Sequence, residues 1–143
     1  MDYEKCSTQS TNKIITASEN HRKLTINNPS AKVVRKIKVD GCLIVDSNER
    51  CDYMFEIDHL SSQVICWVIY LKLKGCDIEK AYTQLVATID RFIVEHRGIK
   101  KECHIVASRV PKAGPKVQQL KIRLLKEKNA TLIVSTDQAF VTI

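Results

Sequence analysis

The sequence contains no apolar segment of the roughly 18 residues that a membrane-spanning helix requires. Its longest apolar run extends only from Val64 to Leu71. The opening residues, MDYEKCSTQS, are polar and acidic, whereas a secretory signal has an apolar centre. We therefore expect no membrane association and a cytoplasmic location.

The sequence also lacks the closely spaced pairs of Cys or His residues that common metal sites use. The chain has six cysteines, but none forms a Cys-x-x-Cys pair, and the four histidines are scattered singly. Common structural zinc sites need such pairs, so we expect no metal role for these residues. Because cytosolic proteins keep their thiols reduced, we expect free cysteines rather than disulfides. Cys66 lies in the apolar run and is expected to be buried there.

Aromatic residues are few, at 6% of the chain, and most lie at predicted core positions. This argues against the aromatic stacking platform that single-strand binders use. No internal repeat, linker or low-complexity tract divides the chain. With 44% hydrophobic and 27% charged residues, the sequence predicts one soluble domain over residues 1–143.

The stretch from Val64 to Gly75, VICWVIYLKLKG, is the strongest structural signal. A continuous apolar run rich in β-branched and aromatic residues predicts a strand that is buried on both faces. Lys72 and Lys74 follow at alternate positions and should point the same way. Because a helix is predicted next, these lysines lie where α/β folds often build a site.

Two further strands are predicted before this run. Alternating residues indicate a half-exposed strand over 33–45, and Cys51 to Ile57 indicates a second one. With the apolar run they would form an antiparallel meander. Residues 1–30 are weakly patterned and predict a helix somewhere in that extension, while Ile14-Ile15 and Leu24-Thr25-Ile26 fit either a short helix or a strand.

Helices and strands alternate in the second half of the chain. Asp77 suits the N-cap of a helix that continues to about Glu95 and is closed by His96-Arg97-Gly98. The core-facing stripe of this helix is formed by Ile78, Ala81, Leu85, Ile89 and Phe92. Residues 101–110 predict a strand parallel to the central one, and residues 115–128 predict a second helix. Residues 130–143 predict a strand pair or one bent strand. The fold class is therefore α/β, with a central mixed sheet flanked by helices.

Three short motifs follow this order of elements. They are Arg50-Cys51-Asp52-Tyr53, Tyr70-Leu71-Lys72-Leu73-Lys74-Gly75 and Ala81-Tyr82-Thr83-Gln84-Leu85. The arrangement resembles the PD-(D/E)xK nuclease superfamily, whose restriction-endonuclease-like core has the order α-β-β-β-α-β. The resemblance covers about residues 33–110. It implies that Asp52 is a metal ligand, that Lys74 is the catalytic lysine and that Gln84 supports the site.

The implied reaction is hydrolysis of a phosphodiester with Mg²⁺ or Mn²⁺. Such ions take oxygen ligands, usually one or two carboxylates with retained waters. In the family two carboxylates on adjacent strands hold the metal. Here Lys72 stands at the second acidic position, which changes the local charge by two units. Since like charges about 4 Å apart repel by a few kcal/mol in a partly buried site, metal should bind weakly or not at all.

Three explanations of Lys72 remain open. The chain is a natural inactive nuclease that still binds nucleic acid, a variant made to abolish activity, or an enzyme whose second carboxylate has moved. Glu56 is the main candidate for a moved ligand, because it shares a strand face with Asp52, while Glu4 and Asp58 are weaker candidates. We expect lost or impaired catalysis rather than rescue.

Structural explanations exist for the same residues. Asp52 can cap a turn, Lys72 and Lys74 can be solvent-facing charges at a strand end, and Gln84 can be an ordinary surface residue of its helix.

The chain is basic, with a formal net charge of +7. Residues 100–128 contain nine Lys or Arg but only two Glu. Such a balance favours a polyanionic partner, and DNA is favoured over RNA. The expected nucleic-acid contacts are Lys80, Arg91, Lys112, Lys116 and Arg123. The alternative is a non-enzymatic module that uses this basic surface for nucleic acid or protein, and a homodimer is also compatible with the sequence.

Overall fold

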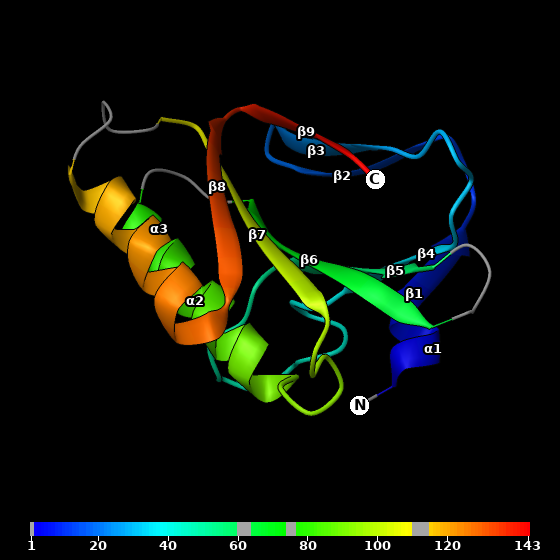
Figure 1. Ribbon diagram of the computed structural model, residues 1–143, viewed down its shortest axis with the longest axis horizontal. Coiled ribbons are helices and arrows are strands. Elements are labelled where there is room, and N and C mark those ends of the chain that lie inside the picture. Colours follow the sequence, from blue (N-terminus) through cyan, green and yellow to red (C-terminus); the bar gives the residue numbers. More distant parts are fainter. Residues whose placement is uncertain (1, 60–63, 74–76, 110–114) are drawn as a thin grey trace.

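The computed structural model describes residues 2–59, 64–73, 77–109 and 115–143 of the chain. A six-stranded sheet runs through the molecule, with two long helices on one face and a small three-stranded sheet on the other (Figure 1). The strands of the large sheet, in spatial order, are β1 (Ser7–Ser10), β4 (Val34–Lys38), β5 (Tyr53–Asp58), β6 (Ile65–Leu73), β7 (Lys100–Ala107) and β8 (Ala130–Thr136).

The remaining elements lie around this sheet. The small sheet contains β2 (Ile14–Glu19), β3 (Arg22–Asn27) and β9 (Gln138–Thr142), and the helices are α1 (Tyr3–Cys6), α2 (Ile78–Arg91) and α3 (Pro115–Lys128). In the described part of the chain, none of the helices has the length and apolarity needed to cross a membrane.

The directions of the strands make the large sheet mixed. β4, β5 and β6 form the expected antiparallel meander, while β6, β7 and β8 are parallel to one another. Parallel neighbours need crossover connections, and α2 and α3 provide them on the same face of the sheet (Figure 1). The predicted α/β class, with a central mixed sheet flanked by helices, is confirmed.

The central strand β6 is buried only over its second half. From Val68 to Leu73 every residue is buried, but Val64 is 63% exposed and Cys66 is exposed. The prediction that Cys66 is buried was wrong, because the covering layers do not reach the first residues of the strand. The buried half is the part that leads to Lys72.

Each face of the large sheet has its own core. Met54, Tyr70 and Leu85 belong to the core between the sheet and the helices. Phe55 and Leu71 belong to the second core, under the small sheet. β4 contributes Ile37 to the first core and Val34 to the second, while its other three residues are partly or fully exposed. It ends at Lys38, so the half-exposed strand predicted over 33–45 was too long.

The first 30 residues form mainly strands, and the helix expected there is short. α1 has only four residues, and β2 and β3 pair antiparallel to build most of the small sheet. Leu24 and Ile26 point from β3 into the second core and are fully buried. These strands therefore supply the layer that buries the second face of the large sheet.

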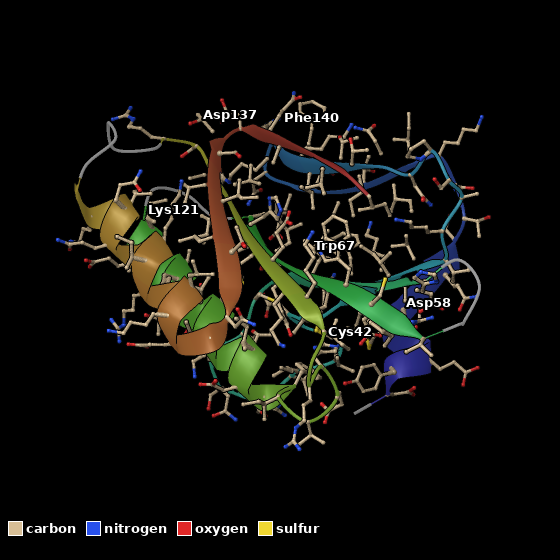
Figure 2. The ribbon with its side chains drawn as sticks, viewed as in Figure 1. Cys42, Asp58, Trp67, Lys121, Asp137 and Phe140 are labelled. Carbon is tan, nitrogen blue, oxygen red and sulfur yellow. A yellow bond between two sulfur atoms is a disulfide. The ribbon has the colours of Figure 1, made fainter. Side chains whose placement is uncertain are left out.

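The last residues form one strand in each sheet. β8 lies at the edge of the large sheet, and β9 pairs parallel to β3 in the small one. The chain changes sheet at Asp137, which has a φ of 60° and whose N–H donates to the carbonyl of Ala107 at 2.8 Å (Figure 2). Residues 130–143 thus form a bent segment rather than a strand pair.

The helix α2 has the apolar stripe that its sequence predicts, since all five residues of the stripe are buried. Asp77 caps its amino end by accepting from the N–H of Lys80 at 3.0 Å. One expectation was wrong, since the helix ends at Arg91 rather than near residue 95. Gln84 and Thr88 are buried, so Gln84 is not the ordinary surface residue of the structural alternative.

A disulfide joins Cys6 to Cys42. It links the end of α1 to the segment after β4, and it contradicts the expectation that all cysteines are reduced. Sequence spacing could not show the pair, because 36 positions separate the two residues and the fold alone brings them together. Of the other described cysteines, Cys51 and Cys103 are buried, and burial raises the pKa of the Cys51 thiol to about 12.

We predict that the free cysteines differ in their reactivity according to their burial. In the native protein at pH 8, iodoacetamide should modify Cys66 rapidly but leave Cys51 and Cys103 unmodified, because a buried thiol with a pKa near 12 stays protonated and inaccessible. Peptide mapping without reductant should recover Cys6 linked to Cys42. Rapid modification of Cys51, or free thiols at Cys6 and Cys42, would contradict the structure.

Candidate functional site

The register of β5 and β6 places Asp52 beside Lys72. Tyr53 pairs with Leu71, and the N–H of Asp52 donates to the Leu71 carbonyl at 2.9 Å, so the ladder continues one residue past the strand. Side chains alternate along a strand, and Asp52 and Lys72 both lie on the face that carries the helices. Residues 20 positions apart in sequence thereby become neighbours.

These two side chains form a buried ion pair. Nζ of Lys72 lies 3.1 Å from Oδ1 of Asp52, and each side chain is only 6% exposed. The second carboxylate oxygen, Oδ2, accepts the N–H of Leu73 at 2.7 Å. Buried charges are tolerated when they are paired and hydrogen-bonded in this way. Lys72 is therefore not the solvent-facing charge that its place at a strand end suggested.

The arrangement does not fit Mg²⁺ or Mn²⁺. Both oxygens of Asp52 already accept hydrogen bonds, and the Lys72 ammonium stands where a second carboxylate would be needed. Across the described ranges, no group of three His, Cys, Asp or Glu side chains is placed to hold a metal. A divalent cation at this point would have to displace a paired ammonium and would then lie beside it.

Helix α2 is tied directly to the start of β5. The hydroxyl of Thr88 accepts the N–H of Cys51 at 2.7 Å and donates to the Gln84 carbonyl at 2.9 Å. This bond holds the helix against the residue that precedes Asp52. It also fixes Gln84 over the sheet, where its Oε1 is buried without a hydrogen-bond partner in the described part of the chain.

Lys72 lines two pockets. One, of about 250 Å³, is lined by Asp40, Ser47, Asn48, Glu49, Arg50, Lys72, Lys80 and Gln84. The other, of about 320 Å³, is lined by Glu19, Asn20, Arg22, Asp40, Asp52, Lys72 and Leu73. We call the first the α2 pocket and the second the β3 pocket. Lys72 thus borders both pockets, and its partner Asp52 borders the second.

Sequence reasoning missed Asp40 and Arg50, which line the α2 pocket. Nε of Arg50 lies 2.9 Å from Oδ1 of Asp40, and the guanidinium also donates to the carbonyls of Asp46 and Asn48. Asp40 precedes Gly41, which has a φ of 79°. An Asp-Gly pair is a known turn signal, and it could have shown that the chain turns here instead of continuing as a strand.

The Glu56 side chain lies in a separate buried network. Its Oε2 is 2.6 Å from Nε2 of His96, and Nδ1 of His96 is 2.7 Å from the Tyr70 hydroxyl. Arg35 adds a contact of 3.4 Å to Oε1 of Glu56 and forms a two-bond pair with Asp58. The hydrogen bonds that Arg35 donates to the Asp58 carboxylate raise the pKa of the Arg35 guanidinium.

This network does not join the Asp52 site. Glu56 lies four residues further along its strand, which corresponds to about 13 Å at the usual strand rise. Glu4 is exposed on α1, and Asp58 is engaged with Arg35. None of the three predicted replacement ligands is therefore brought to Asp52, and each has a structural explanation.

The expected nucleic-acid contacts differ in their surroundings. Lys80 is exposed and lines the α2 pocket. Arg91 lies 3.4 Å from Asp46, Lys116 pairs with Glu79, and Arg123 pairs with Glu127 at 3.3 Å. Exposed pairs of this kind are weak and remain available to a polyanion. Lys74 and Lys112 lie outside the described residues, so their predicted roles stay predictions.

Comparisons with family models, with curated proteins and with solved structures found no match to this chain.

We predict that substitutions of Asp52 and Lys72 have strongly non-additive effects on the free energy of unfolding. Lys72→Met should lower the free energy of unfolding by about 3 kcal/mol, because it leaves a buried carboxylate unpaired. Adding Asp52→Asn should recover about half of that loss or more, since the amide oxygen can still accept the Leu73 N–H. Urea unfolding monitored by circular dichroism measures both values.

Lys80→Met is the matched control for this experiment. Lys80 is exposed, so the same chemical change there should alter the free energy of unfolding by less than about 0.5 kcal/mol. If the double variant were as unstable as Lys72→Met alone, the two charges would not be coupled as described.

Proposed function

We propose that this protein binds nucleic acid through a restriction-endonuclease-like core whose hydrolytic site is silent. The strands β4 to β8 and the helices α2 and α3 support this proposal through their order and directions. Asp52, position 72 and Gln84 are the residues that the resemblance to PD-(D/E)xK nucleases assigns to the site. Asp52 directly precedes β5, position 72 lies in β6 and Gln84 lies in α2, and each of the three lines at least one of the two pockets.

The observation that carries the proposal is the buried ion pair. In a nuclease of this kind, carboxylates at positions 52 and 72 would hold the divalent ion that activates the attack on phosphorus. Here the carboxylate of Asp52 is neutralised by Lys72 at 3.1 Å. On this proposal the position of the site is kept without the ligands for the metal, so we expect binding without efficient cleavage.

The basic surface supports a nucleic-acid partner, with DNA favoured over RNA. Lys80, Lys116, Lys121, Arg123 and Lys126 all project from α2 and α3, the layer that flanks the α2 pocket, and Figure 2 labels Lys121 on α3. Because the whole chain has a net charge of +7 and these cations gather on the helix layer, the layer should attract phosphates without reading sequence. We therefore expect affinity that falls steeply with salt.

We predict that Lys72→Glu gains metal-dependent behaviour. The variant places a second carboxylate beside Asp52, and the two negative charges should then require a divalent cation. Mn²⁺ should raise the melting temperature of this variant but not that of the wild type, because an ion that binds the folded state stabilises that state. Thermal unfolding with and without Mn²⁺ measures the difference. Cleavage of plasmid DNA in Mg²⁺ should appear in the variant alone.

Two controls make this test specific. Adding Asp52→Asn to Lys72→Glu should abolish both the thermal response and the cleavage. Adding Lys74→Ala should abolish cleavage but keep the thermal response, since the lysine is assigned to the reaction and not to the metal. Cleavage by the wild-type chain in Mg²⁺ would contradict the silent site, and no metal response in Lys72→Glu would contradict the assignment of position 72.

We predict that charge reversal on α3 weakens binding to all DNA sequences alike. Lys121 and Lys126 form no ion pair with the described residues, so Lys121→Glu with Lys126→Glu should not disrupt the fold. The double variant should reduce the slope of log K against log salt by about two and lower affinity for unrelated duplexes to the same degree. Fluorescence anisotropy at several salt concentrations measures this, and an effect confined to one sequence would contradict it.

A further inference from the structure

The charge at the candidate site equals that of a site already loaded with metal. Replacing a carboxylate by an ammonium at position 72 adds two positive charges, which is the charge of one divalent ion. Asp52 and Lys72 together are neutral, as two carboxylates with one Mg²⁺ would be. A phosphate that approaches this point therefore meets a cation that is covalently attached to the chain.

The two pockets beside the pair differ in their charged lining. The β3 pocket contains the carboxylates of Glu19, Asp40 and Asp52 against two cations. The α2 pocket contains the cations of Arg50, Lys72 and Lys80 against two carboxylates. The lining of the α2 pocket is therefore more favourable to an anion than that of the β3 pocket.

The two carboxylates of the α2 pocket do not occupy the N–H donors of Lys72. Asp40 is already paired with Arg50 at 2.9 Å, and Glu49 is exposed. The Lys72 ammonium has three N–H donors, and its described hydrogen bond, to Asp52, uses one of them. Lys72 can therefore hold Asp52 and a phosphate oxygen at the same time, with Lys80 at the exposed rim.

Gln84 adds an acceptor to the same pocket. Its Oε1 is buried and has no hydrogen-bond partner in the part of the chain that the structure describes. A buried acceptor without a donor is costly, so it indicates a group that can donate to it. An exposed base N–H beside a phosphate supplies such a donor, which favours a nucleotide unit over an isolated inorganic anion.

We propose that Lys72 holds a backbone phosphate of nucleic acid in the α2 pocket in place of a metal ion, so that binding needs no divalent cation. This inference rests on the proposed nucleic-acid function and extends it to one residue. Lys80 assists at the rim, and Gln84 accepts from the adjacent nucleotide. No covalent bond is made or broken: the phosphate stays bound to the Lys72 ammonium and is not hydrolysed.

Fluorescence anisotropy with a short labelled DNA duplex tests this inference in buffer with EDTA and in buffer with Mg²⁺ at matched ionic strength. The wild type should bind with the same dissociation constant, within about twofold, in both buffers. The double variant Lys72→Met with Asp52→Asn has the same net charge as the wild type and lacks only the ammonium and its partner. Its affinity should fall at least about tenfold in both buffers.

Lys72→Glu provides the complementary result. It should bind weakly in EDTA and regain affinity in Mn²⁺, because the metal then replaces the ammonium. Lys80→Gln, at an exposed position that does not threaten folding, should weaken wild-type binding about threefold in EDTA. Lys13→Gln is the matched control, since Lys13 is exposed and lines neither pocket, and it should bind as the wild type does.

The outcomes separate the inference from the proposed function. Wild-type binding that requires Mg²⁺ would overturn the inference, as would unchanged affinity in both Lys80→Gln and the Lys72–Asp52 double variant. In either case the nucleic-acid function itself would stand. Absence of any binding by the wild type at low salt would overturn the proposed function and the inference together.

Discussion

The ion pair between Asp52 and Lys72 is the interaction on which the candidate site depends. A buried carboxylate and a buried ammonium are each costly alone and tolerable only together. Because their ladder position is fixed by the pairing of Tyr53 with Leu71, the backbone of β5 and β6 determines the contact. The pair neutralises the Asp52 carboxylate and holds the Lys72 ammonium at the same place.

The surrounding structure keeps this place accessible. The bond from the Cys51 N–H to Thr88 holds α2 beside the start of β5, and the turn at Gly41 brings Asp40 to the edge of both pockets. The disulfide between Cys6 and Cys42 links the segment after β4 to α1. The residues around the pair are thus fixed by bonds that do not involve the pair itself.

Local patterns predicted the elements whose contacts are local, and they failed where distant segments meet. The stripe that includes Leu85 identified α2, and the apolar run identified the buried half of β6. The small sheet was missed because β3 gains its parallel partner, β9, from the other end of the chain. The motifs around Asp52 and Lys72 named two residues that the fold brings together, but spacing could not show that Lys72 would be buried against the carboxylate rather than exposed.

Direct measurement of Mn²⁺ binding tests the central claim that Lys72 occupies the role of a metal. Electron paramagnetic resonance reports free Mn²⁺, so a titration gives the number of ions bound by each chain without nucleic acid present. The account predicts no specific binding by the wild type and one ion bound by Lys72→Glu, lost again when Asp52→Asn is added. One Mn²⁺ bound by the wild-type chain and released by Asp52→Asn would contradict it.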